Sequence, residues 1–180
     1  MTDNRNNNGF TLVEMIIWIV LIAIIGGVTA MVVATQFKAV SAVEGRKAIV
    51  IDGSSSTRKF TRDFAHLPDN QSLTLAKSDQ IEFFTNQGFT VQYKLGNGLL
   101  SRQIIGQGGL QILSKNVDIQ TSAFNYYDKQ NNLLTGFPLS ANNRKKVWRV
   151  ELVLTLVNGD EIILNKADVF PENLKINSLQ

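Results

Sequence analysis

The chain has 180 residues, of which 44% are hydrophobic. Its 18 Lys and Arg residues and 15 Asp and Glu residues leave a net charge of +3, which is too small to predict a nucleic-acid-binding surface. The absence of cysteine excludes disulfides, thiol catalysis and cysteine-based zinc sites.

The first predicted element is a membrane-spanning helix near the N-terminus. It follows the short polar leader MTDNRNNNG, and the 23 residues from Met15 to Phe37 carry no formal charge. At about 1.5 Å per residue, this run makes a helix roughly 34 Å long, enough to cross a hydrocarbon core of about 30 Å. The apolar region of a secretory signal peptide is shorter, about 7 to 15 residues.

The charges that flank this helix predict a cytoplasmic C-terminal domain. Arg5 and the initiator amine precede the helix, whereas Lys38, Arg46 and Lys47 follow it. Basic residues favour the cytoplasmic side of a membrane, although large domains can be translocated regardless of charge. Charge balance alone therefore leaves the orientation open.

The segment Gly9-Phe10-Thr11-Leu12-Val13-Glu14 resembles the cleavage and methylation motif of type IV prepilins and pseudopilins. The motif, the length of the leader and the apolar run agree with one another. The resemblance implies that a prepilin peptidase cuts after Gly9 on the cytoplasmic face and that the new N-terminus, Phe10, is N-methylated. It also implies a C-terminal domain outside the cytoplasm, against the charge balance.

Glu14 is an acid inside an apolar helix, where a lone charge at the membrane centre costs about 2.5–3.5 kcal/mol. After cleavage its carboxylate lies four residues, roughly 6 Å along the axis, from the amine of Phe10. The resemblance implies that Glu14 pairs with the N-terminal amine of a neighbouring subunit and so sets register and recruitment during assembly. The alternative is an interfacial carboxylate that faces lipid headgroups.

Gly26 and Gly27 lie in the middle of the same helix. Each costs a helix in water about 1 kcal/mol, although glycine is commoner in membrane helices. Two readings are open: close packing against other helices through small residues, or a soft point where the helix bends or melts during extraction into a filament.

Beyond Phe37 the helix is expected to continue, and Pro68 ends it. The sequence DGSSS, residues 52–56, predicts either a short break or the N-cap of a second helical piece. One face of the last segment is apolar (Phe60, Phe64 and Leu67), and the other is expected to be solvated (Arg58, Lys59, Arg62 and Asp63).

From Leu73 the pattern alternates with period two, which predicts strands. Asn97-Gly98 and Asn158-Gly159 favour tight turns between strands. The expected architecture is α+β: an antiparallel sheet packed on the amphipathic end of the helix. The predicted strands are 72–76, 80–86, 89–95, 98–105, 116–128, 145–157 and 160–166, and the side chains of the sixth expected in the core are Trp148, Val150, Leu152, Leu154 and Leu156.

The C-terminal half carries a looser resemblance to minor pseudopilins of the J type and PilW-like minor pilins. It rests on KFTRDFAHL at 59–67, on Tyr126-Tyr127-Asp128 with the following loop and the strand VWRVELVL, and on VFPENL at 169–174. The lack of a cysteine pair separates the chain from disulfide-looped major pilins.

No catalytic constellation stands out, and we expect no enzyme, no metal and no cofactor. His66 is the only histidine, which excludes a His-pair metal site. Ser54–Ser56 has no base nearby in the sequence, Gly106–Gly109 does not open a phosphate-binding helix, and residues 128–132 lack a calcium-loop signature.

The sequence thus predicts a minor pilin or pseudopilin that is assembled into a type IV pilus, a type II secretion pseudopilus or a DNA-uptake machine, in its initiation or tip complex. Expected partners are the prepilin peptidase, other pilins, the inner-membrane assembly platform and membrane lipid. Nucleic acid is not expected, although DNA uptake would make Arg144, Lys145 and Lys146 candidates for a DNA contact. The alternative is a signal-anchored extracytoplasmic binding domain that does not polymerise.

The predicted parts of the chain are the leader 1–9, the transmembrane and filament-core helix 10–37, its amphipathic continuation 38–68 and the sheet domain 69–180. The chain is expected to pass once through the inner membrane before the filament forms.

Overall fold

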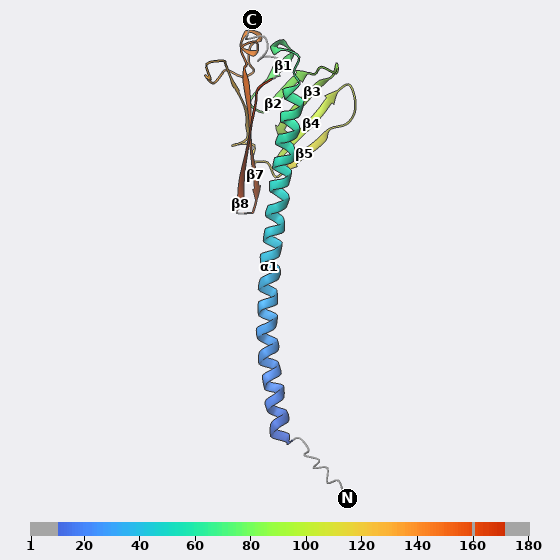
Figure 1. Ribbon diagram of the computed structural model, residues 1–180, viewed down its shortest axis with the longest axis vertical. Coiled ribbons are helices and arrows are strands. Elements are labelled where there is room, and N and C mark those ends of the chain that lie inside the picture. The colour runs from blue at the N-terminus through green and yellow to red at the C-terminus, as the bar shows by residue number, and fades with distance from the viewer. Residues whose placement is uncertain (1–10, 160, 172–180) are drawn as a thin grey trace, which may run out of the picture. The chain divides into compact units, whose positions relative to one another are not determined.

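The computed structural model of this chain describes residues 11–159 and 161–171, in two compact units that meet in sequence between Glu44 and Gly45. Figure 1 shows the order of the elements along the chain. These are α1 (Leu12–Ala65), the 3-10 helix η1 (Asn70–Ser72), β1 (Leu73–Ala76), β2 (Gln80–Phe84), β3 (Thr90–Gly96), β4 (Leu99–Ile105), β5 (Gln111–Lys115), β6 (Ala123–Tyr127), α2 (Ala141–Arg144), β7 (Arg149–Asn158) and β8 (Glu161–Val169).

Helix α1 runs without interruption through residues 52–56, so both the predicted break and the predicted N-cap are wrong. Gly and Ser are poor helix formers, because they favour other backbone conformations. Here tertiary contacts override that preference. The Oγ of Ser56 lies 2.7 Å from the Oγ of Ser114 and donates to the carbonyl of Leu113 at 2.9 Å, which ties this turn of the helix to β5.

The α+β architecture is confirmed, with two antiparallel sheets in the C-terminal unit. The five-stranded sheet has the order β1-β2-β3-β4-β5, and the three-stranded sheet has the order β6-β7-β8. Strand β5 was not predicted. The long strand expected over 116–128 is reduced to β6, because the carboxylate of Asp118 accepts hydrogen bonds from the Gln120 amide and the Thr121 hydroxyl and folds this segment into a turn.

The two-residue hairpin at Asn97-Gly98 is confirmed. Gly96 pairs with Leu99, and the turn residues have φ of 53° and 71°. Positive φ at both central residues defines the turn type whose twist suits an antiparallel hairpin, and Asn and Gly adopt it most readily.

The core lies between the sheets and the last turns of α1 in the C-terminal unit (Figure 1). The aromatic ring of Phe60 meets those of Phe64, Tyr93 and Phe124, with ring centroids 5.2–5.6 Å apart. The predicted inward set of β7 is confirmed for four side chains that are fully buried: Val150, Leu152, Leu154 and Leu156.

Trp148 is a correction to that set. It precedes β7 and is only half-buried, and the Nζ of Lys129 lies 5.6 Å from the centroid of its ring. Val147 and Thr155, which the alternation assigned to the outer face, are buried instead. Period-two alternation predicts direction only where the strand is regular, and Val147 lies before its start.

Candidate assembly site

The described part of the N-terminal unit is a helix with no buried face. Its side chains from Leu12 to Glu44 are exposed, and α1 is long and apolar enough, by length and composition, to cross a membrane. A helix that is apolar all round is stable only inside a larger core or in lipid. This segment therefore needs lipid or other helices around it.

Glu14 lies in the first turn of this helix. Its backbone N–H donates to the Oγ1 of Thr11 at 3.3 Å, and the N–H of Met15 donates to the carbonyl of Thr11 at 3.2 Å, so Thr11 acts as the N-cap. A carboxylate in the first turn is favoured by the helix dipole. Among the residues that the structure describes, none pairs with the Glu14 carboxylate, and Gly9 and Phe10 lie outside that part of the chain.

Gly26 and Gly27 lie inside an unbroken stretch of α1. A Cβ added at either position would meet no atom of the described chain within 4 Å. The fold of this single chain therefore gives no reason for glycine here. Close approach of another helix would be such a reason, as would a need for local flexibility.

In the C-terminal unit Asp63 departs from expectation, because it faces the sheet and not solvent. Its Oδ2 accepts hydrogen bonds from the Tyr93 hydroxyl at 2.8 Å and from the Nε of Arg102 at 2.6 Å, and the Asp63 and Arg102 side chains are 12% and 13% exposed. Burial, and then the adjacent Asp63 charge, raise the pKa of Tyr93 far above its usual range. Burial disfavours the charge of Arg102, but the hydrogen bond and the charge of Asp63 outweigh it and raise its pKa.

A cavity of about 320 Å³ opens beside this cluster. Asp63, His66 and Arg102 line its polar wall, while Val91 and Ile104 contribute apolar surface. The Asp63–Arg102 ion pair in this wall has both of its partners within the fold. A salt bridge of this kind is a common structural feature. Among the described residues, no group of three or more His, Cys, Asp or Glu side chains could hold a metal ion.

Two further sequence candidates have local structural partners. Arg144 donates from its Nε to the carbonyl of Leu73 at 3.0 Å and from its Nη1 to that of Leu139 at 2.9 Å, so it fastens the α2 loop to β1. The carboxylate of Asp128 accepts from the backbone and side chain of Asn132 at 2.8 and 3.0 Å, which closes a turn. The side-chain bond from Asn132 is the main cause that lowers the pKa of Asp128.

The family described as the prokaryotic N-terminal methylation motif matches residues 4–30, which include Gly9, Phe10, Glu14 and both mid-helix glycines. No curated protein matches the chain. The chain thus carries an N-terminal methylation motif of the kind found in type IV prepilin-like proteins, which are structural subunits. The match ends at residue 30, so the J-type and PilW-like resemblance of the C-terminal half stays a prediction.

The motif and the apolar helix together define the class of site. Proteins with this motif are substrates of a prepilin peptidase and assemble with other pilins, and the helix near the N-terminus fits a membrane anchor. The residues predicted for this site form a contiguous motif, which makes them visible in the sequence. The Asp63 cluster was not predicted, because Tyr93 and Arg102 lie 30 and 39 residues from Asp63 in the sequence.

Proposed function

We propose that this protein is a minor pilin or pseudopilin, a structural subunit that joins a type IV pilus, a type II secretion pseudopilus or a DNA-uptake machine after cleavage behind Gly9. The observation that carries the proposal is an all-round apolar helix with Glu14 in its first turn, inside a methylation motif. Its place is the initiation or tip complex. Before assembly the apolar helix spans the inner membrane, with the C-terminal domain outside the cytoplasm.

The mechanism is assembly. Transfer of Glu14 into a dry helix bundle leaves its charge without water, and the methylated amine of Phe10 from a neighbouring subunit neutralises it. A displaced register would leave both charges unpaired. The pair therefore selects one vertical offset between neighbours, while Gly26 and Gly27 let helices approach or bend.

Intact-mass and N-terminal peptide analysis of the protein from its native membrane tests the proposal. The expected mature chain begins with N-methylated Phe10 and co-purifies with other pilins after mild shearing or cross-linking. An intact Met1 terminus on a protein that fractionates alone supports the signal-anchored, non-polymerising domain and overturns the proposal. Secretion, pilus or competence genes found beside this gene would indicate which machine the protein serves.

A further inference from the structure

The β8 strand presents a long, regular edge in the C-terminal unit. Its nine residues, Glu161–Val169, pair with β7 in uninterrupted register, and no described strand pairs with its other side. Both edge strands of the five-stranded sheet are shorter and less regular than β8. Strands β1 and β5 have four and five residues, and each has a register shift in its pairing. Short or irregular edges resist the addition of a further strand, and β8 lacks both protections.

A groove lies between this edge strand and α1. Its volume is about 470 Å³, and small side chains line part of it: Thr57, Thr61, Ala65 and Ala167. Arg58, Arg62 and Lys166, all exposed, line it as well, together with His66. Short side chains on the groove surface leave room for the main chain of an added segment, and we call this region the α1–β8 groove.

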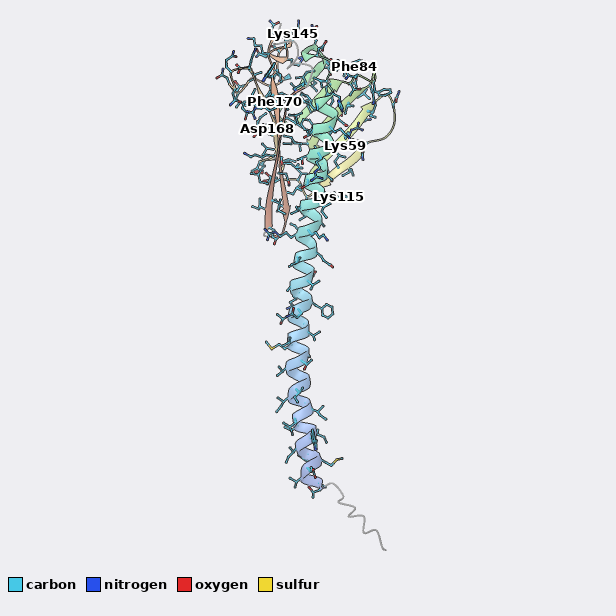
Figure 2. The ribbon with its side chains drawn as sticks, viewed as in Figure 1. Lys59, Phe84, Lys115, Lys145, Asp168 and Phe170 are labelled. Atoms are coloured by element: carbon cyan, nitrogen blue, oxygen red, sulfur yellow. The ribbon has the colours of Figure 1, made fainter. Side chains whose placement is uncertain are left out.

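The cations of the α1–β8 groove are not neutralised within the described residues. The two ion pairs found there join Arg102 to Asp63 and Arg149 to Asp168, and neither involves Arg58, Arg62 or Lys166. A second open hollow, lined by Val50, Ile51 and Lys59 among others, shares Arg58 and Arg62 and continues along α1. Figure 2 shows Lys59 on α1 and Asp168 on β8.

We propose that the α1–β8 groove binds an extended acidic segment of a partner protein, which adds to β8 as a fourth strand and places its carboxylates against Arg58, Arg62 and Lys166. Main-chain hydrogen bonds to the free edge supply affinity, and the cations supply selectivity. If the proposed function holds, the partner is another filament protein, but the binding does not rest on polymerisation.

Charge selects this occupant over two others. A second copy of the chain that paired through its own β8 edge would bring a further set of the same cations to this edge. The chain's own segment 172–180, ENLKINSLQ, has one Glu and one Lys and offers no excess negative charge. A nucleic acid would satisfy the cations but leaves the unpaired backbone of β8 without a partner.

The test uses the full-length protein in detergent micelles and a fluorescent acidic peptide of about ten residues that alternates Glu with Val or Thr, a pattern suited to an added strand. One control peptide has the same side chains with alternate backbone amides methylated on its bonding edge. A single-stranded oligonucleotide of equal charge is the second control. Binding is measured by fluorescence anisotropy, and hydrogen exchange of residues 161–169 by mass spectrometry.

We expect the acidic peptide to bind and to slow exchange in β8. Arg58→Glu with Arg62→Glu should weaken binding by about tenfold or more. The matched control, Lys94→Glu with Lys115→Glu, reverses two exposed cations of the five-stranded sheet and should change binding less than about twofold. Circular dichroism melting confirms that both variants are folded, and the exchange readout on the unmodified chain keeps the test valid if either is not.

Three results would overturn the proposal. Equal binding of the methylated peptide would show that the strand edge is not used. Equal or tighter binding of the oligonucleotide would assign the cations to a polyanion. Self-association of the chain that disappears in the Arg58→Glu, Arg62→Glu variant would assign the groove to a second copy.

Discussion

The side chain of Asn165 on β8 occupies the space into which a side chain at Gly53 of α1 would project. A Cβ at Gly53 would lie 2.8 Å from the Cγ of Asn165 and 3.0 Å from the Cδ1 of Leu156. Real Cβ atoms do not come this close to another heavy atom of the fold, so glycine sets the distance between helix and hairpin. The Nδ2 of Asn165 is buried with no hydrogen-bond partner among the described residues.

Gly53→Ala is therefore expected to destabilise the C-terminal domain by up to about 2 kcal/mol, because an overpacking cost of about 1–3 kcal/mol opposes the better helix propensity of alanine. Overpacking outweighs the gain of about 1 kcal/mol in helix propensity. The measurement is chemical unfolding of the domain followed by circular dichroism. Gly53→Ala combined with Asn165→Ala should recover part of the loss, because it removes both the clash and the unpaired amide. Gly26→Ala, where a Cβ meets only open space, is the matched control and should leave unfolding of the domain unchanged.

The Asp63 cluster gives a second prediction about stability. Asp63→Ala removes the acceptor of two hydrogen bonds and leaves the Arg102 charge largely buried, so we expect a loss of about 3 kcal/mol. Arg102→Met with Asp63→Ala should cost less than the sum of the single changes, with a coupling of about 0.5–3 kcal/mol. A double-mutant cycle of unfolding free energies measures this coupling, and strict additivity would contradict a direct pair.

The sequence predicted the apolar helix, the hairpin turn at Asn97-Gly98 and the buried face of β7 because each depends on neighbours in the chain. Period, length and turn residues are local properties. The sequence did not predict the continuous helix at residues 52–56. There Ser56 is hydrogen-bonded to Ser114, which lies 58 positions away, and this contact stabilises a segment of weak helix propensity. The prediction from the sequence failed at Asp63 for the same reason, since the partner that turns this acid inward is on β4. Charge on a helix face predicts exposure only when no distant partner exists.

The tyrosines predict how the domain responds to alkali. Burial is the first cause that raises the pKa of Tyr93, of Tyr126 and of Tyr127 above the ordinary value of 10.0. In the unfolded chain these phenols ionise near their usual pKa of about 10. The folded state therefore holds its protons longer, and the stability linked to them is present below about pH 10 and is lost as pH rises above it.

We expect the free energy of unfolding to fall steeply above about pH 10. The phenolate absorbance of the two fully buried residues, Tyr93 and Tyr126, should rise cooperatively with loss of structure and not as two independent titrations. Tyr93→Phe should flatten this dependence on pH, because it removes one proton-linked group. A gradual phenolate titration with the circular dichroism unchanged would contradict the burial of these rings. Tyr127, the least buried of the three, serves as the internal control and should ionise first.

The outer face of the three-stranded sheet predicts lateral contacts between this domain and its neighbours. Ile162 and Leu164 are 70% and 56% exposed on β8, and their partners across the strand pair are Val157 and Thr155. Exposed apolar side chains that adjoin one another mark interaction surfaces more often than isolated ones do. Ile162→Asn with Leu164→Thr should leave folding intact and reduce cross-linking to other pilins in the membrane. Unchanged cross-linking would remove this face from the assembly.

Glu14 provides the sharpest test of the proposed assembly mechanism, because its replacement leaves the predicted cleavage site at Gly9 and Phe10 unaltered. Glu14→Gln keeps the shape and hydrogen-bonding capacity of the side chain and removes only the charge. We expect the variant to be processed and N-methylated normally, but to be recovered in the filament fraction at about a tenth or less of the wild-type level, since even about 1.4 kcal/mol of lost pairing lowers an equilibrium tenfold. Glu14→Asp, which keeps the charge on a shorter side chain, should be recovered in the filament fraction at a level between those of Glu14→Gln and the wild type. A charge pair with the neighbouring amine requires an ionised side chain, which Gln cannot supply. Normal recovery of Glu14→Gln in the filament fraction would therefore contradict the pair and favour a carboxylate that faces lipid headgroups.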